Sequence, residues 1–240
     1  MIVEGARMRI FLFTLVATMA TASPAAAATR NFGITDFTKI RVTGPYKVSL
    51  ETGVAPFARA TGSPAALDRV KVEVRGDTLV VQADPSWGGY PGEDTGPVEV
   101  SIGTHDLTNA NLFGAGSLAI DLVKGLGFTM TLEGSGLGEI GKVAADQLTI
   151  NLDGSASARL AGEANKLTAS VRGVSALDAS RLGARNAAIS AEGTAAIDAN
   201  VTGTAAVGGR GASTIRFSGG PSCTVKTSGS TSVSGCKLTR

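Results

Sequence analysis

Large aromatic side chains are scarce in this sequence. Its 240 residues include 8 phenylalanines, 2 tyrosines and 1 tryptophan, against 32 glycines. A core built on large rings is therefore disfavoured, and the interior has to be aliphatic and small. The length leaves room for one large all-β domain or for two small domains.

A strong excess of positive charge is also lacking. Lys and Arg number 22 and Asp and Glu number 20, which gives a formal net charge of +2 at 18% charged residues. A nucleic-acid-binding domain usually carries a concentrated basic surface, so we expect no nucleic acid as a partner.

Residues that hold metals or carry out known catalytic reactions are few. His105 is the only histidine, and the two cysteines lie far from it in the sequence. We therefore expect no metal site and no cofactor. The nucleophile elbow, the HExxH motif and the calcium-binding GGxGxD array are all missing from the sequence, which therefore predicts no catalytic residues.

Long hydrophobic runs do not occur after the first 28 residues. Within that segment two arginines precede an apolar run, Ile10 to Ala20, and Ala26 and Ala28 give the small-residue spacing of a cleavage site. The run is shorter than the roughly 20 apolar residues of a membrane-spanning helix. We interpret residues 1–28 as a signal peptide, with export across the inner membrane to the periplasm or the outer cell surface and no transmembrane segment in the mature chain.

The two cysteines, Cys223 and Cys236, lie close together near the C-terminal end. Export would place them in an oxidising compartment, where such a pair favours a disulfide over a redox motif. We predict a disulfide that staples the C-terminal end. Two free thiols are the alternative.

What the sequence has in abundance is a repeated glycine. Glycines in the same setting recur at intervals of 20, 20, 19, 20, 18 and 18 residues, which indicates an internal repeat. Mostly apolar residues stand six, four and two positions before each glycine, and four and six positions after it. This alternation predicts two short strands per repeat, each with one buried face, and a bend between them. The predicted corner glycines are Gly114, Gly134, Gly154, Gly173, Gly193, Gly211 and Gly229.

A unit of 18 to 20 residues with two inward stripes cannot bury itself, but stacked units share one continuous core. The sequence therefore predicts an all-β fold, a single-stranded parallel β-helix or β-solenoid. Short crossovers between parallel strands favour the right-handed form. Each glycine serves the geometry of a corner, where dihedral angles or close backbone approach would be incompatible with a Cβ atom.

The first part of the mature chain is less regular than the repeats. Val70 to Arg75 and Thr78 to Gln82, on either side of a Gly-Asp pair, indicate a hairpin. We expect one β-solenoid domain over residues 29–240, with opening coils and a cap in 29–106 and the glycine-marked repeats in 107–234. A separate N-terminal domain is the alternative, and the lack of a break in composition argues against it.

The outward positions beside the glycines carry two ladders of charge whose signs mostly alternate. Solvated ladders of this kind stabilise a stack by up to about 1 kcal/mol per pair of neighbours. The alternative interpretation is catalytic. Two like-charged pairs in these ladders would have the separation of about 5 Å that the carboxyl pair of a retaining glycosidase has. Nothing apolar is evident nearby to raise the pKa of one carboxyl, which argues against catalysis. The like-charged pairs are Glu133 with Asp153 and Asp178 with Asp198.

Several segments resemble the head GIN domain of the putative auto-transporter adhesins, a family without an established activity. They are "FTKIRVTGPYKVSLETG", "LDRVKVEVRGDTLVVQAD", "VEVSIGTHDLTNANLFGAGS" and the glycine repeats that follow, from about Phe37 to Val233. The resemblance implies a right-handed parallel β-helix-like fold, an envelope location and no catalytic residues. The later repeats depart from the pattern, since "DGSAS", "RGVSA" and "EGTAA" lose the second glycine.

The first of three functional hypotheses is an exported non-catalytic envelope protein, adhesin-like by resemblance, that binds or scaffolds polysaccharide or another envelope protein through its solenoid surface. The loop at 84–97 is its candidate site, because aromatic rings on loops suit sugar faces and partner pockets. The alternative is that the tryptophan covers the flank of the rod. The candidate binding residues are Trp87, Tyr90, Glu93 and Asp94.

The second hypothesis is a polysaccharide-active enzyme on a β-helix, an analogy of fold alone. His105 beside Asp106 is its only other candidate, and neighbours along a strand point to opposite faces, which disfavours a catalytic dyad. The third hypothesis is a structural, self-assembling protein that stacks through exposed strand edges. A disulfide over the last coil would oppose such growth.

Overall fold

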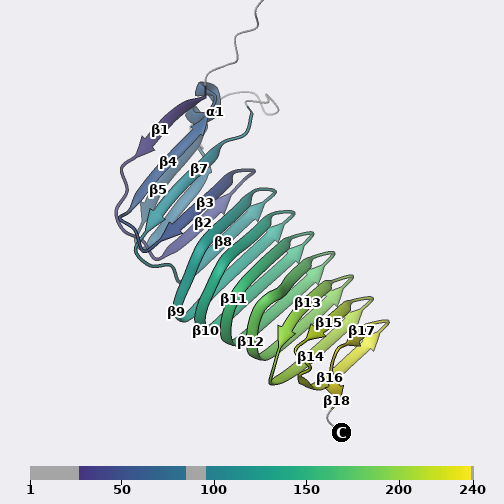
Figure 1. Ribbon diagram of the computed structural model, residues 1–240. Helices are drawn as coiled ribbons and strands as arrows, with labels where there is room; N and C mark the ends of the chain where they lie inside the picture. Colours follow the sequence, from purple (N-terminus) through teal and green to yellow (C-terminus); the bar gives the residue numbers. More distant parts are fainter. Residues whose placement is uncertain (1–26, 85–95, 239–240) are drawn as a thin grey trace, which may run out of the picture.

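The computed structural model describes residues 27–84 and 96–238, which form a rod of stacked coils with a cap at its N-terminal end (Figure 1). The described residues contain one 18-stranded sheet and a single short helix, α1 (Pro64–Asp68). The predicted all-β solenoid is confirmed. Residues 1–26 of the predicted signal peptide lie outside the described residues, so the signal peptide stays a prediction. No described helix is long and apolar enough to cross a membrane.

The strands follow one another along the whole described chain. In the cap and the first coil they are β1 (Ala28–Phe32), β2 (Lys39–Thr43), β3 (Lys47–Thr52), β4 (Phe57–Gly62), β5 (Val70–Arg75), β6 (Thr78–Ala83) and β7 (Glu99–Thr104). In the repeats they are β8 (Asn109–Gly114), β9 (Ser117–Gly134), β10 (Leu137–Gly154), β11 (Ser157–Gly173), β12 (Ala176–Gly193), β13 (Ala196–Val201), β14 (Thr204–Gly211), β15 (Thr214–Ser218), β16 (Ser222–Gly229), β17 (Ser232–Ser234) and β18 (Lys237–Leu238).

Successive coils pair in parallel and in register, so that like positions of the repeat stack on one another. Leu148 pairs with Phe128 of the coil before and with Leu167 of the coil after. All three side chains are at most 2% exposed. The period-two pattern therefore builds one continuous, aliphatic core along the rod.

The prediction of two short strands per repeat is wrong for the middle coils. There β9 and β10 each run for 18 residues from one corner glycine to the next. The extra length comes from a third stretch, in which Val143 and Ala145 of β10 pair with Val123 and Gly125 of β9. Each strand pairs with the next coil on both sides of this bend, with a register shift between Ile140 and Val143 where β10 pairs with β11.

The seven predicted corner glycines all have positive φ, between 79° and 110°. Six of the seven carbonyls, all but that of Gly229, accept a hydrogen bond from the next coil, as Gly134 O does from Ser155 N at 2.7 Å. A Cβ on Gly154 would lie 2.7 Å from that same carbonyl oxygen. The corner thus excludes side chains twice, by its dihedral angles and by the close stacking of backbone on backbone.

An eighth corner glycine, Gly44, precedes the seven. Its φ is 120°, and its N–H donates to Phe113 O at 2.9 Å, so it stacks below Gly114. The sequence interval to Gly114 is 70 residues because the cap is inserted between the first and second coils. The sequence pattern around Gly44 could have revealed this corner. Val42 stands two positions before it and Val48 four positions after it, as apolar residues do in the other repeats, and both are buried.

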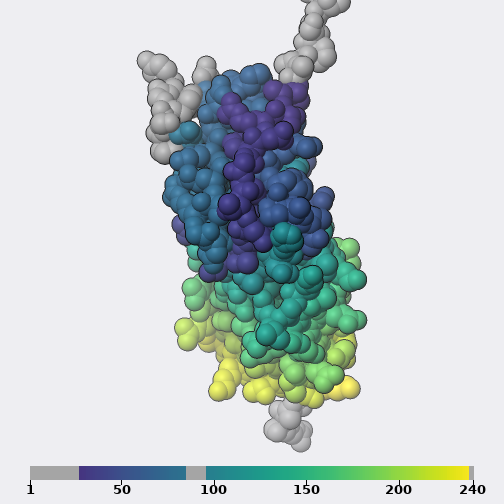
Figure 2. Space-filling model, turned by 90° about the vertical axis from the view of Figure 1, so that its left-hand side faces the viewer, coloured from purple at the N-terminus to yellow at the C-terminus, as the bar shows by residue number. Residues whose placement is uncertain are grey.

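The cap continues both walls of the first coil toward the N-terminus. Strand β6 pairs in parallel with β2, and β7 with β3, whereas β5 and β4 then add antiparallel to β6 and β7. The predicted β5–β6 hairpin is confirmed. Strand β1 pairs with β4 and forms the outer edge, where the N-terminal segment runs along the face of the cap (Figure 2).

Helix α1 links β4 to β5 and was missed in the sequence. Ser63 caps it, its hydroxyl accepting from Ala66 N at 3.1 Å, and Pro64 occupies the first turn. The "SPAALD" segment carries both start signals of a helix. Its five residues are too few to show a helical period, which is why the strand pattern around it prevailed.

The predicted disulfide is present at the other end of the rod. Cys223 lies on β16, 1% exposed, and is bonded to Cys236 just before β18, with the two Cα atoms 5.6 Å apart. The bond closes the loop that contains β17, and so ties the last coil to the one below it.

Candidate functional site

The four predicted binding residues Trp87, Tyr90, Glu93 and Asp94 lie outside the described residues, and their role stays a prediction. Polar side chains or large hollows gather at other places on the described surface. Among them are a polar cluster at the junction of cap and coils, a groove along one corner of the coils, and a hollow on the flank near the C-terminal end.

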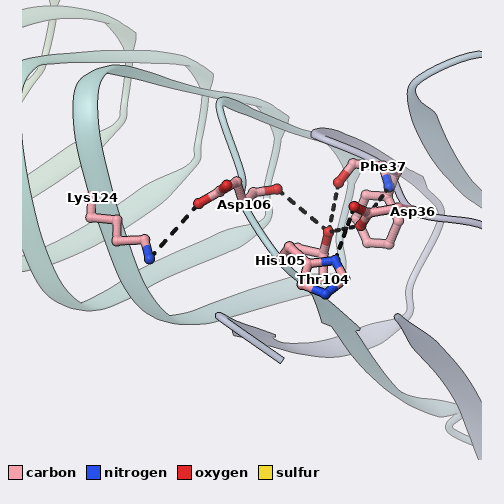
Figure 3. A network of polar contacts seen from close by, with 6 residues as sticks. All are labelled: Asp36, Phe37, Thr104, His105, Asp106 and Lys124. Atoms are coloured by element: carbon pink, nitrogen blue, oxygen red, sulfur yellow. Dashed lines mark hydrogen bonds and ion pairs between the residues drawn. The ribbon is translucent and has the colours of Figure 1, made fainter. Parts of the chain in front are cut away.

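The polar cluster is centred on Asp36, in the segment before β2 (Figure 3). Its carboxylate lies 3.0 Å from His105 Nδ1 and accepts from Thr104 Oγ1 at 3.1 Å. Thr104 is fully buried and also donates to Phe37 O at 2.6 Å. Asp106 turns away toward Lys124, whose Nζ lies 3.9 Å from its carboxylate.

This cluster is a clamp between the entry to β2 and the link from β7 to β8. His105 does find a carboxylate, but from Asp36 and not from its sequence neighbour Asp106. The hydrogen bond from His105, with those from Thr104 and the Phe37 backbone, lowers the pKa of Asp36 below its ordinary value. A carboxylate held ionised in this way is suited to an ion pair and a cap for backbone N–H, and not to donating a proton as a general acid.

The clamp should make stability depend on pH in acid. Because the pKa of Asp36 is lower in the folded protein, its contribution is present above the ordinary value of 3.8 and is lost as the pH falls through the folded value. We expect Asp36→Asn to destabilise the protein at about pH 5, and the difference from wild type to shrink as the pH is lowered. Urea unfolding of both proteins at several pH values measures this. A difference that stays constant with pH would contradict the clamp.

The acidic pairs that suggested a glycosidase do stack as expected. Asp153 pairs with Glu133, and Asp178 with Asp198, in the registers of neighbouring coils. Hydrogen bonds from the hydroxyl and the backbone N–H of Ser180 lower the pKa of Asp178. The shift is opposite to the one that a catalytic acid needs.

A groove, here named the corner groove, follows the bend at residues 144–146 of β10 and at the equivalent positions of the neighbouring coils. This bend is called the third bend of the coil. The groove has a volume of about 710 Å³ and crosses β9, β10, β11 and β12. Leu126, 82% exposed, stands at one end of it, and Thr202 at the other. It is lined by Gly125, Leu126, Ala144, Ala145, Asp146, Glu163, Ala164, Asn165, Gly183, Ala184, Arg185 and Thr202.

Two adjoining hollows of about 480 and 450 Å³ lie on the flank near the C-terminal end, here together named the C-terminal depression. Ser190, Gly208 and Lys226 line both of them. The depression arises because outward side chains of β12 and β14 shrink to alanine and glycine between larger residues of β11 and β16. Its outward residues are Thr168, Ser170, Ala188, Ser190, Glu192, Ala206, Gly208, Arg210, Thr224, Lys226 and Ser228.

Charge is distributed unevenly along the rod. Residues 199–240 contain five of the 22 Lys and Arg and none of the 20 Asp and Glu. All 20 acidic residues and 17 basic ones therefore lie in residues 1–198. A net charge of +2 for the whole chain conceals this basic end, and charge counted separately for each part of the chain would have found it.

A family model matches residues 36–221, nearly the whole solenoid, under the description "putative auto-transporter adhesin, head GIN domain". The chain belongs to this family. The resemblance inferred from the sequence is thereby confirmed. The match begins at Asp36, the residue of the clamp, and ends just before β16, so the disulfide lies beyond it.

Solved structures share the fold of this head GIN domain protein. A putative adhesin from Bacteroides fragilis superposes with a TM-score of 0.79 at 20% identity, covering 88% of this chain and 97% of its own. A putative lipid binding protein from Parabacteroides distasonis gives 0.68 at 21% identity, covering 89% and 97%. A putative adhesin from Parabacteroides merdae gives 0.67 at 18% identity, covering 86% and 95%.

The comparison with curated proteins finds no match. At these identities the solved structures show the fold alone. Among the residues that the structure describes, no group of three or more His, Cys, Asp and Glu side chains is placed to hold a metal ion.

Proposed function

We propose that this protein is an exported, non-catalytic envelope protein that binds an extended polymer, a polysaccharide or another envelope protein, along the side of its solenoid. The observation that carries the proposal is the corner groove, which crosses four long strands in succession. The family name and the neighbours described as putative adhesins support a role in binding at the cell surface.

The register of the coils makes such a groove linear. Like positions repeat at about 4.8 Å along the rod, so a ligand that lies parallel to the axis meets a new set of side chains at each step. In this groove the set changes from Leu126 through Asp146 and Asn165 to Arg185. Apolar, amide and charged groups in a row suit an extended chain with mixed chemistry better than a compact small molecule.

The polar cluster at Asp36 and the acidic pair that contains Asp178 favour binding over catalysis. The pKa of Asp36 and that of Asp178 are both lowered by the hydrogen bonds that they accept. General acid chemistry on a glycosidic bond requires the opposite shift in one member of a carboxyl pair.

Filling the corner groove tests the proposal. Gly183 lines the groove, its φ is not positive, and a Cβ there would have no neighbour closer than 3.7 Å. Gly183→Trp should therefore fold normally and block the groove. We expect it to lose at least about tenfold in affinity in a glycan array and in pull-down of cell-envelope fractions, as one excluded set of contacts is worth more than about 1.4 kcal/mol.

The matched control is Gly33→Trp, at a position in the cap segment with no atom within 4 Å of a Cβ. It should bind as wild type does, and the melting temperatures of all three proteins should agree. Equal binding by Gly183→Trp and wild type would contradict a role for the groove. Loss of binding only in a Trp87→Ala, Tyr90→Ala double variant would assign recognition to residues 84–97.

A further inference from the structure

We infer that the C-terminal depression binds the acidic groups of an anionic polysaccharide. This inference rests on the proposed function and adds to it the charge of the ligand and a second surface. Three observations carry it: two cations without an ionic partner, a hydroxyl-lined hollow between and beside them, and the absence of carboxylates from this end of the sequence.

The two cations are Arg210 and Lys226, on the neighbouring strands β14 and β16. Glu192 stacks between Arg172 and Arg210 in the charge ladder, but its carboxylate is taken by Arg172, whose Nε lies 3.4 Å away. Among the described residues Arg210 and Lys226 form no ion pair, and both are exposed. They are therefore available to an anion from solution.

Residues 199–240 supply no acidic side chain that would compete for these cations. Asp198 is the last acidic residue of the sequence, and it pairs with Arg216 at 3.7 Å on the other wall of the coil. From there to the end, every ionisable charge on a side chain is positive. The local potential favours anions, and this attraction acts over about a Debye length of 10 Å in 0.1 M salt.

The depression also offers partners for neutral sugar groups. Ser190 and Thr224 present exposed hydroxyls, and Thr168 and Ser170 present half-buried ones. Between these hydroxyls the hollow is lined by small residues of β12 and β14, among them Ala188 and Ala206. Hydroxyl groups beside an arginine that can bind a carboxylate or sulfate in bidentate fashion match the groups on an acidic sugar.

The same charge would attract an anionic membrane, but the apolar surface argues against it. The large hydrophobic side chains that are exposed in the described residues are Phe57, Leu126, Leu137 and Val174. None lies among the coils that carry Arg210 and Lys226. A surface that docks on lipid combines basic residues with apolar side chains that enter the headgroup region.

The test compares oligogalacturonate, as the acidic glycan, with neutral dextran oligosaccharides of similar length, by calorimetry on the full chain. We expect oligogalacturonate to bind and dextran to bind at least tenfold more weakly. Arg210→Ala with Lys226→Ala should weaken the binding of oligogalacturonate at least about tenfold, since hydrogen bonds to charged groups are stronger than those between neutral groups. Raising the salt concentration to 1 M should also weaken the binding of oligogalacturonate, because the Debye length falls to about 3 Å and the attraction between charges is screened.

Further variants separate geometry from charge. Gly208→Trp fills the depression without backbone strain, since a Cβ there would be 3.9 Å from its nearest neighbour, and should also abolish binding. Lys142→Ala with Lys166→Ala removes two exposed cations elsewhere, and it should have no effect. Equal binding of both glycans, no oligogalacturonate binding, or an unchanged affinity in the double variant at Arg210 and Lys226 would overturn the inference. Binding to phosphatidylglycerol vesicles without glycan binding would also overturn it.

The two proposals fail in different ways. If dextran or envelope material binds and only Gly183→Trp reduces it, the proposed function holds and the acidic site does not. If oligogalacturonate binds through Arg210 and Lys226 while Gly183→Trp has no effect anywhere, the depression and not the corner groove is the binding surface. If no polymer binds to wild type in either experiment, both proposals fail.

Discussion

Gly154→Ala is expected to lower the free energy of unfolding by about 2–4 kcal/mol, with a clear fall in the urea midpoint. The φ of Gly154 is +93°, which a residue with a Cβ reaches only at a cost of about 1–2 kcal/mol. The new methyl group would also lie 2.7 Å from Gly134 O, a backbone atom that accepts a hydrogen bond from Ser155. Relief requires the two coils to separate, so the strain adds to the conformational cost.

The control is a glycine in the same strand system that has no such constraint. Gly127 has no positive φ, and its Cβ would meet nothing closer than 3.9 Å. Gly127→Ala should change stability by less than about 1 kcal/mol, and it can be stabilising because alanine restricts the unfolded chain. Equal losses at Gly154 and Gly127 would show that the corner does not depend on its glycine.

Reduction of the Cys223–Cys236 disulfide is expected to destabilise the last coil by about 3 kcal/mol, the value for a loop of about 15 residues. In a stack of coils each unit contacts only its neighbours, so the loss should stay local. Amide hydrogen exchange should show faster exchange in β15–β18 and little change in β10 and β11. A uniform loss of protection along the rod would contradict this.

The same reduction tests the assembly hypothesis. The Cys223→Ala, Cys236→Ala double variant is the control, since its exchange and its elution volume should not respond to reductant. If the disulfide blocks edge-to-edge stacking, the reduced wild type and the double variant should both elute earlier at higher concentration in size exclusion, and the oxidised wild type should not. A single concentration-independent elution volume in all three would remove self-assembly from the candidate functions.

Much of the architecture was predictable because its signals are local and repeated. An apolar residue at every second position predicts the same strand with one buried face in each coil. An irregular repeat can therefore be interpreted from its neighbours. The charge ladders show this most directly: Glu139, Arg159 and Asp178 stand at equal offsets from their glycines and pair in the structure. Where the repeat is interrupted, between Gly44 and Gly114, the sequence predicted opening coils and a cap but did not identify Gly44 as a corner glycine.

The candidate site was less predictable, because it depends on contacts between distant positions. His105 lies beside Asp106 in the sequence, but its ring meets Asp36, 69 positions away. The corner groove requires the third bend of the coil, which has no glycine signal common to all repeats. The C-terminal depression depends on which outward side chains are small in adjacent coils, and this appears only when the register is known.

The sequence by itself determined the coil length, the inward and outward alternation and the glycine corners, because each follows from residue types at fixed spacing. It favoured a C-terminal disulfide over two free thiols, and the structure forms that bond. Only the tertiary structure decided the rest. The cap is inserted between the first two coils, the strands continue through the third bend, and small side chains in adjacent coils leave hollows along the rod. These features come from stacking, in which every position gains neighbours that are 18 to 20 residues away along the chain, or much further where the cap intervenes.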